Sequence, residues 1–260
     1  MLAVISAYDL KYIELEETID TLEKMFNTIS KLQKWNGHLY NWYNTHTLEP
    51  LIPRYISTVD NGNFIGYLYT VKQFLINTLQ KNIELNPNYV GESCVRPQSE
   101  NESNENPVGV AAHSDPKYRE KIPQIIQIID NIINSTDFSV LYDHKKHLFS
   151  IGYDVEQNKL TNSYYDLLAS EARQASLVAI AKKDVNPKHW NALSRTLTSL
   201  NKYKGLISWS GTAFEYLMPN VNIKQYEGSM LDESCRFLIM SQMEYAKRLR
   251  NTLGNIRSGI

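Results

Sequence analysis

The sequence is poor in cysteine and glycine, with 2 and 11 of these residues among 260. Two cysteines, Cys94 and Cys235, are too few for a disulfide framework, and no CxxC or Cys/His cluster predicts a zinc site. Neither a Walker loop nor a GxGxxG run is present, so the sequence lacks a cradle for nucleotide phosphates. We therefore expect a protein with reduced thiols that uses neither a metal nor a cofactor.

The charges show no surplus of either sign. Lys and Arg number 27 against 28 Asp and Glu, which leaves a formal net charge of -1. This balance lacks the basic field that nucleic acids and anionic lipids require. No run approaches the ~18 to 20 apolar residues that cross a bilayer, and MLAVISAYDL at the start lacks the regions of a signal peptide. We expect a soluble, cytoplasmic chain with no nucleic-acid partner and no direct membrane insertion.

Apolar residues at helical spacing organise most of the chain. They predict a long helix over about 9–34, a second over 66–84, and a third after Pro116. These positions are Leu15, Ile19, Leu22, Phe26 and Ile29; Leu68, Val71, Leu75 and Leu79; and Ile122, Ile125, Ile126, Ile129, Ile132 and Ile133. The pattern predicts a mainly α fold.

Two segments depart from the helical pattern. Residues 138–161 alternate apolar and polar side chains around charged turns, which predicts a small β-hairpin insertion. Residues 91–117 contain SENESNENP, which is too polar to bury and predicts a mobile loop. His144 and His147 lie in the hairpin segment among lysines. Without a nearby acid they favour a solvated turn over a metal site.

The sharpest chemical signal is Glu171 in YDLLASEAR. A helix over about 163–182 would be apolar on nearly every side, and such a helix is buried. Asp166, Glu171 and Arg173 would then enter an interior or a lined cavity, where an unpaired charge is unfavourable. A buried carboxyl that stays protonated is what a general acid needs to protonate a glycosidic oxygen. The competing interpretation is a structural ion pair between Glu171 and Arg173.

Aromatic and polar residues in GHLYNWYNTHTLEPLIPRYISTVDNGN predict a carbohydrate site. Its candidate sugar contacts are Trp42, Tyr43, Arg54, Asp60 and Asn63. The rings offer flat faces for a sugar to stack on, and the polar groups offer paired hydrogen bonds to hydroxyls. The dipeptide Asn61–Gly62 is also an ordinary turn signal, so Asp60 has a second interpretation as the residue that begins a turn.

A third polar cluster lies in SWSGTAFEYLMP. Here Ser210 is expected to cap a short helix that Pro219 ends, which would leave Trp209 and Glu215 beside the cavity as further sugar contacts. Glu215 is equally well read as a first-turn carboxylate favoured by the helix dipole. A serine nucleophile is not supported, because the flanking glycines have the wrong spacing for GxSxG.

Four blocks in the same order carry a specific resemblance. They are GHLYNWYNTHTLEPLIPRYISTVDNGN, FSVLYDHKKHLFSIGYDV, YDLLASEARQASLVAIAKKDVNPKHW and LISWSGTAFEYLMPNV. Together they resemble the glycoamylase-like region of cyclic β-1,2-glucan synthases, over about residues 9–250. That region is an (α/α)6 toroid that closes linear β-1,2-glucan into rings by transglycosylation. The same fold is similar to that of endo-β-1,2-glucanases, which hydrolyse this linkage.

The resemblance assigns Glu171 to one of the family's two catalytic carboxylates. The other is expected after the helix CRFLIMSQMEYAKRLRN, where this chain ends in TLGNIRSGI without an acid. The resemblance therefore implies an incomplete toroid over 1–260, inactive alone, which binds β-1,2-glucan and pairs with the remainder of a split synthase. As part of a full synthase it would be associated with the inner membrane. A glucanase-like hydrolase and a non-catalytic glucan-binding or helical interaction protein are the alternatives.

Overall fold

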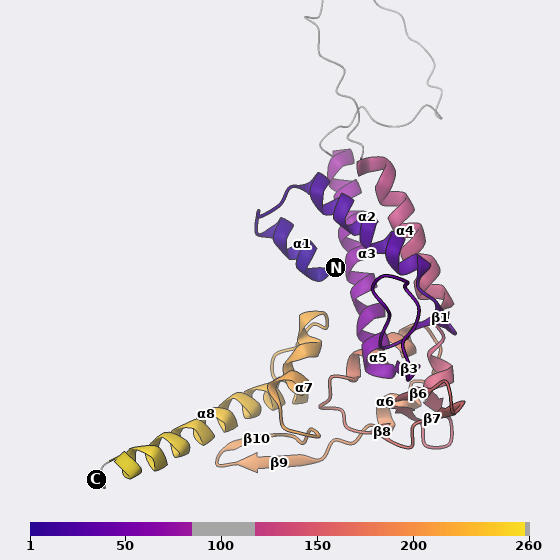
Figure 1. Ribbon diagram of the computed structural model, residues 1–260. Helices are drawn as coiled ribbons and strands as arrows, with labels where there is room; N and C mark the ends of the chain where they lie inside the picture. Colours follow the sequence, from indigo (N-terminus) through magenta and orange to yellow (C-terminus); the bar gives the residue numbers. More distant parts are fainter. Residues whose placement is uncertain (85–117, 258–260) are drawn as a thin grey trace, which may run out of the picture. The chain divides into compact units, whose positions relative to one another are not determined.

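The computed structural model describes residues 1–84 and 118–257, and the predicted mobile loop at 91–117 lies outside them (Figure 1). The chain divides into two compact units. The first unit comprises Met1–Ser30 and Thr70–Asp130, and the second comprises Lys31–Tyr69 and Asn131–Ile260. Within the described ranges, every helix is too short or too polar to span a membrane.

The first unit is built from helices. It contains α1 (Leu2–Asp9), most of α2 (Leu15–Lys31), and parts of α3 (Thr58–Glu84) and α4 (Tyr118–Ser135). The predicted apolar positions supply its buried side chains, which include Ile19, Leu22, Phe26, Val71, Leu75, Ile122, Ile125 and Ile129. Ion pairs add to this packing, since Lys121 lies 2.7 Å from Asp20 and 2.8 Å from Glu23.

The three predicted helices are confirmed, although their boundaries differ. The first predicted helix is interrupted after α1, because Lys11 adopts a left-handed backbone conformation with φ 61°. The second begins at Thr58, eight residues earlier than the predicted Gly66. Its extension contains TVDNGN, a stretch whose Asn and Gly are poor helix formers and so gave no helical signal.

Short antiparallel strands form the middle of the second unit. They are β1 (Lys34–Trp35), β2 (His38–Leu39), β3 (Tyr55–Ser57), β4 (Tyr142–Asp143), β5 (Leu148–Ser150), β6 (Gly152–Asp154), β7 (Lys159–Leu160) and β8 (Tyr164–Tyr165). One sheet has the order β3-β6-β7 and another the order β4-β5-β8. The predicted hairpin insertion over 138–161 is therefore confirmed, preceded by the 3-10 helix η1 (Phe138–Leu141).

The predicted helix over 163–182 is wrong in its first half. Tyr164 and Tyr165 pair with β5 as a strand, and the main chain of Leu168 hydrogen-bonds to Ser194. Only α5 (Arg173–Ala181) is helical. The error has a physical cause: a short apolar run is equally compatible with a buried strand or turn, and periodicity alone does not separate them.

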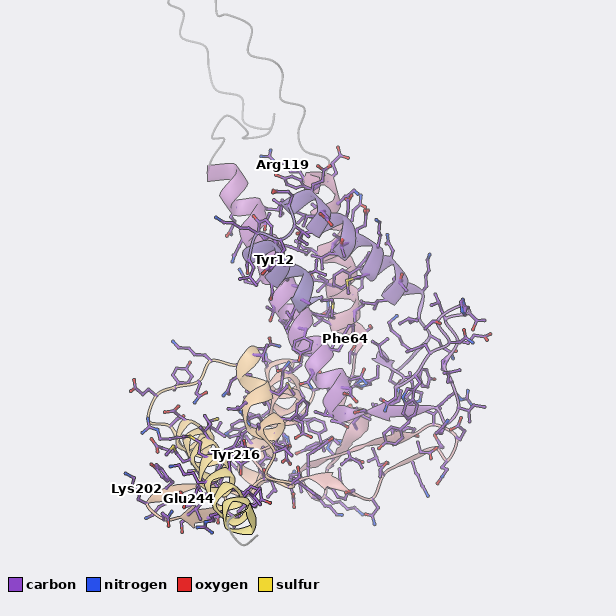
Figure 2. All side chains as sticks on the ribbon, turned by 60° about the vertical axis from the view of Figure 1, so that its left-hand side comes forward. Tyr12, Phe64, Arg119, Lys202, Tyr216 and Glu244 are labelled. Atoms are coloured by element: carbon purple, nitrogen blue, oxygen red, sulfur yellow. The ribbon has the colours of Figure 1, made fainter. Side chains whose placement is uncertain are left out.

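The rest of the second unit packs around a separate apolar cluster. Its elements are α6 (Lys188–Ala192), β9 (Leu197–Leu200), β10 (Tyr203–Leu206), α7 (Ala213–Leu217), η2 (Met218–Val221) and α8 (Met230–Arg257). The cluster consists of Leu168, Ala169, Leu193, Leu206, Tyr216, Cys235 and Leu238, with Tyr216 labelled in Figure 2. It holds the segment before Glu171 against α7 and α8.

Candidate functional site

A cleft of about 320 Å³ opens beside the first turns of α3. It is lined by Leu39, Tyr40, Asn41, Trp42, Asp60, Asn61 and Phe64. Phe64 is labelled on α3 in Figure 2. Trp42 is 49% exposed despite its size, and Asp60 is exposed beside it. An open aromatic face next to a carboxylate is chemically suited to a sugar ring and its hydroxyls.

Asn61 fixes one wall of this cleft. Its side-chain oxygen accepts a hydrogen bond of 2.7 Å from the main-chain N–H of Leu39, and its amide donates to the Leu39 carbonyl at 3.0 Å. The same amide donates to Ser57 O at 2.9 Å. Asn61 and Gly62 are thus helical, and the turn interpretation of Asp60 is wrong: Asp60 lies in the first turn of α3.

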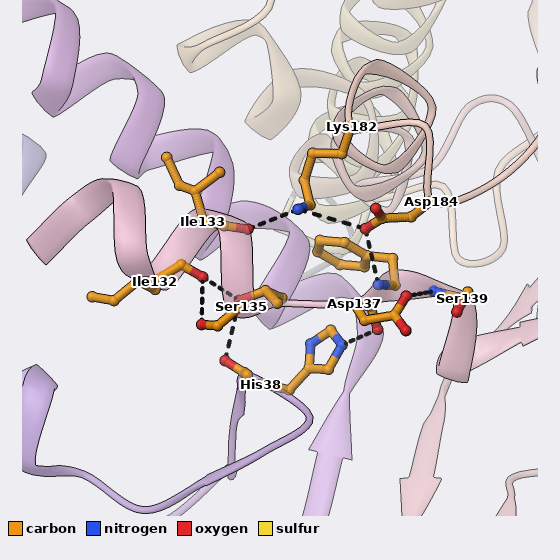
Figure 3. Close-up of polar contacts among 11 residues, drawn as sticks. His38, Ile132, Ile133, Ser135, Asp137, Ser139, Lys182 and Asp184 are labelled. Atoms are coloured by element: carbon orange, nitrogen blue, oxygen red, sulfur yellow. Dashed lines mark hydrogen bonds and ion pairs between the residues drawn. The ribbon is translucent and has the colours of Figure 1, made fainter. Parts of the chain in front are cut away.

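The strand before the cleft is anchored by a buried polar network (Figure 3). The His38 ring Nε2 donates to the carbonyl of Asp137 at 2.8 Å, and Thr136 Oγ1 donates to Gly37 O at 3.1 Å. Burial lowers the pKa of His38 to about 4, so the imidazole is neutral at physiological pH. Asp184 accepts from the N–H of Phe138 at 3.1 Å. The network holds β2, and hence the cleft wall that follows it, to the end of α4.

Gly62 permits α5 to approach α3 closely. A Cβ added at Gly62 would lie 2.1 Å from the Cβ of Ala175, so no other residue fits without displacement. At the next residue of α3, the amide of Gln174 donates to Asn63 O at 3.3 Å. The crossing brings the start of α5, and with it the segment of Glu171, against the helix that carries Asp60.

The buried guanidinium of Arg173 fastens the Glu171 segment to α7. Arg173 is 2% exposed and donates to the carbonyl oxygens of Ser170 and Glu215, both at 3.3 Å. It also donates to Tyr216 O at 2.7 Å and to Asn220 Oδ1 at 3.1 Å. Among the described residues no ion pair joins Arg173 to Glu171. The predicted structural ion pair between these two residues is therefore wrong.

Glu171 itself is half-buried and lies just before α5. Its carboxylate accepts a side-chain hydrogen bond from Ser170 Oγ at 3.3 Å. Burial raises the pKa of Tyr165 well above its usual range, and the negative charges of Glu171 and Asp60 add to this rise.

The carboxylate of Glu215 forms hydrogen bonds at the N-terminus of its own helix, α7. Thr212, not Ser210, is the N-cap of α7, and Thr212 and Glu215 form a reciprocal capping box. The carboxylate also accepts hydrogen bonds from Ser208 Oγ at 3.0 Å and from Ser210 Oγ at 2.7 Å. These bonds fix the loop that presents Trp209, which is 57% exposed. Serines near the start of a helix predict a cap without showing which residue occupies the position.

Bonds within the protein engage three other predicted sugar contacts, Tyr43, Arg54 and Asp166. The Tyr43 hydroxyl donates to Gln33 O at 2.7 Å and accepts from the N–H of Tyr40 at 2.9 Å, so its ring belongs to the fold beside the cleft. Arg54 forms an ion pair of 3.0 Å with Glu156. The main-chain carbonyl of Asp166 accepts from Ser194 N–H.

Several cleft residues were not predicted from the sequence. They are Leu39, Tyr40, Asn41, Asn61 and Phe64. Four of them stand in the first of the four blocks and Phe64 directly follows its last residue, so proximity in sequence to Trp42 and Asp60 was a usable signal. In residues 1–84 and 118–257, no group of three or more His, Cys, Asp or Glu side chains is placed to hold a metal ion.

Comparison with known proteins gives one clear sequence relative. No protein-family model matches the chain. The chain is 28% identical to the cyclic β-(1,2)-glucan synthase NdvB of Rhizobium meliloti (strain 1021) over 339 aligned residues. That alignment covers 98% of this chain but 12% of the synthase. The resemblance to cyclic β-1,2-glucan synthases predicted from the four blocks is confirmed.

Solved structures show the fold. An endo-β-1,2-glucanase from Chitinophaga pinensis, crystallised with sophorotriose and glucose, is similar at TM-score 0.62 and 11% identity. A glucoamylase candidate from Bacteroides fragilis is similar at TM-score 0.63 and 13% identity. Each match covers 92% of this chain and 52% of the other. At such identities the likeness establishes the fold alone, which confirms a mainly helical, glucoamylase-like architecture.

Proposed function

We propose that residues 1–260 form part of a glycoamylase-like (α/α)6 domain whose cleft binds β-1,2-glucan. The observation that carries this proposal is the cleft, where the exposed ring of Trp42 stands beside the carboxylate of Asp60. The glucan specificity is supported by the similarity to the synthase, and by the shared fold with a glucanase whose structure holds a β-1,2-linked trisaccharide.

Glu171 is the carboxylate we assign to chemistry at the glycosidic bond. Cleavage or transfer at that bond ordinarily requires two carboxyl groups on opposite sides of the sugar. The chain spans 12% of the synthase and about half of the two structures, so we expect ring formation to require sequence outside the aligned region. The partner is then the remainder of a synthase. The chain alone is expected to bind glucan with little turnover.

The other predicted sugar contacts also belong to the proposed site, in different roles. They are Arg54, Asn63, Asp166, Arg173, Trp209, Ser210 and Glu215. Arg173 and Glu215 fix the segments that carry Glu171 and Trp209 through their internal hydrogen bonds. A glucanase-like hydrolase is the second candidate, supported by the fold shared with the Chitinophaga enzyme. Reducing-end release from linear β-1,2-glucan, without ring products, would distinguish hydrolysis from transglycosylation.

Binding is tested by isothermal titration calorimetry with linear β-1,2-glucan oligosaccharides. Trp42→Ala is expected to weaken affinity about tenfold, because losing a stacking face of this kind is worth about 1.4 kcal/mol. Tyr245→Ala, which removes an exposed aromatic side chain from α8, serves as the control and should leave affinity unchanged. Absence of both heat and tryptophan quenching with the unaltered chain would refute sugar recognition.

A further inference from the structure

Asn41 lines the cleft, and one end of its side-chain amide is open to a ligand. The oxygen Oδ1 accepts a hydrogen bond of 3.2 Å from the main-chain N–H of Ser57. In the part of the chain that the structure describes, the nitrogen Nδ2 has no hydrogen-bond partner, and this atom is not buried. An amide nitrogen carries two N–H donors, so the free end of Asn41 can donate hydrogen bonds but cannot accept them.

Contacts with β3 fix the orientation of this amide. The N–H of Ser57 can be accepted only by the amide oxygen, so the nitrogen of Asn41 points away from Ser57. The main-chain N–H of Asn41 also donates to Tyr55 O at 2.9 Å. Asn61, which lines the same cleft, differs because both ends of its amide are engaged by Leu39 and Ser57. Asn41 therefore holds its free donor in place before a ligand arrives, which favours binding.

Ser57 also holds the first turn of α3, which carries Asp60. The main-chain N–H of Asp60 donates to Ser57 Oγ at 3.3 Å. Ser57 is thus in direct contact with Asn41 and with Asp60, and both of these residues line the same cleft. Within residues 1–84 and 118–257, Asp60 takes part in no ion pair. Because an ionised carboxylate only accepts hydrogen bonds, the cleft offers a ligand one donor and one acceptor, both anchored on Ser57.

We propose that Asn41 binds glucan directly, its amide donating to one hydroxyl of a glucose unit while the neighbouring hydroxyl donates to Asp60. This inference rests on the proposed function. In a β-1,2-linked chain the oxygens of the first two ring carbons form the linkages. Each internal unit therefore keeps adjacent hydroxyls on its third and fourth carbons. A hydroxyl both donates and accepts, so one of the pair can accept from Asn41 and the other can donate to Asp60.

The affinity of Asn41→Asp for linear β-1,2-glucan tests this contact. Aspartate keeps the shape of the side chain and the oxygen that accepts from Ser57, but it lacks the N–H donors. We expect about tenfold weaker binding by calorimetry. Asn44→Asp is the matched control, because Asn44 does not line the cleft and its Oδ1 accepts from the N–H groups of His46 at 2.8 Å and Thr47 at 3.1 Å. The same change of charge there should leave the affinity within about twofold of that of the unaltered chain.

Two sugar analogues test the pairing of hydroxyls. They are β-1,2-linked trisaccharides that lack the hydroxyl on the third ring carbon of every unit, or on the fourth. Each should bind the unaltered chain about tenfold more weakly than the parent trisaccharide does. The analogue that lacks the hydroxyl bound by Asn41 should bind Asn41→Asp as tightly as the parent does, because the contact is already lost in that variant.

Three results would overturn this inference and leave the proposed function standing. They are an Asn41→Asp variant that binds glucan as tightly as the unaltered chain, analogues that bind the unaltered chain as tightly as the parent trisaccharide, and equal losses of affinity in both proteins for both analogues. If the unaltered chain binds neither glucan nor the parent trisaccharide, the proposed function itself fails.

Discussion

Arg173→Ala should lower the free energy of unfolding by about 3–5 kcal/mol. The guanidinium is buried and satisfies the carbonyl oxygens of Ser170, Glu215 and Tyr216. Alanine would leave these acceptors unpaired in the interior. Arg173→Lys should recover part of the loss, because an ammonium keeps the charge but lacks the planar fork that reaches several acceptors at once.

Chemical denaturation measures this effect, with Arg236→Ala as the control. The Arg236 side chain is 60% exposed on α8 and lies 3.7 Å from Glu233. An exposed pair of this kind contributes between zero and about 1 kcal/mol. Equal losses at the two arginines would show that Arg173 does not join the Glu171 segment to α7 in the way its hydrogen bonds indicate. Glucan affinity of Arg173→Lys should fall as well, because Glu171 loses its support.

Glu215→Ala should lower the free energy of unfolding by about 2–4 kcal/mol at pH 7. Burial opposes ionisation of this carboxyl, but hydrogen bonds from Ser210, Thr212 and Ser208 outweigh it, and together they lower the pKa of Glu215 below its ordinary value of 4.5. A lowered pKa in the folded state means that the stabilisation is present above about pH 4.5 and is lost as the pH falls below that value.

The stability difference between the unaltered chain and Glu215→Gln should therefore shrink in acid. Denaturation midpoints measured from pH 7 to pH 3 give this difference directly. Glu233→Ala is a suitable control, since Glu233 also lies in the first turn of a helix but its side chain is 49% exposed. A difference that stays constant through this range would show that the ionised carboxylate of Glu215 is not what stabilises the loop of Trp209.

The helical part of the fold could be predicted because its signal is local. Ile19, Leu22 and Phe26 repeat at helical spacing and are all fully buried. The segment around Glu171 could not be predicted in the same way. Tyr165 lies in a strand only because β5, about fifteen residues earlier, offers a partner, and that pairing leaves no trace in the spacing of apolar residues.

The residues of the candidate site, too, could be predicted only in part from the sequence. Trp42 and Asp60 were predicted from their chemistry, and the structure places both on the cleft. The role of Asn61 depends on a contact with another segment, because its side chain hydrogen-bonds to the main chain of Leu39. The resemblance to glucan synthases identified the segments involved. It did not show which side chains form the fold and which remain open to a ligand.

Glucan is expected to bind in the cleft that Trp42 and Asp60 line. A crystal structure of the chain with a β-1,2-linked oligosaccharide tests this most directly. We expect a sugar ring stacked on Trp42, with sugar oxygens at hydrogen-bond distance from the side chain of Asp60. Sugar bound elsewhere, or a cleft that stays empty while the oligosaccharide is present in excess, would contradict the assignment.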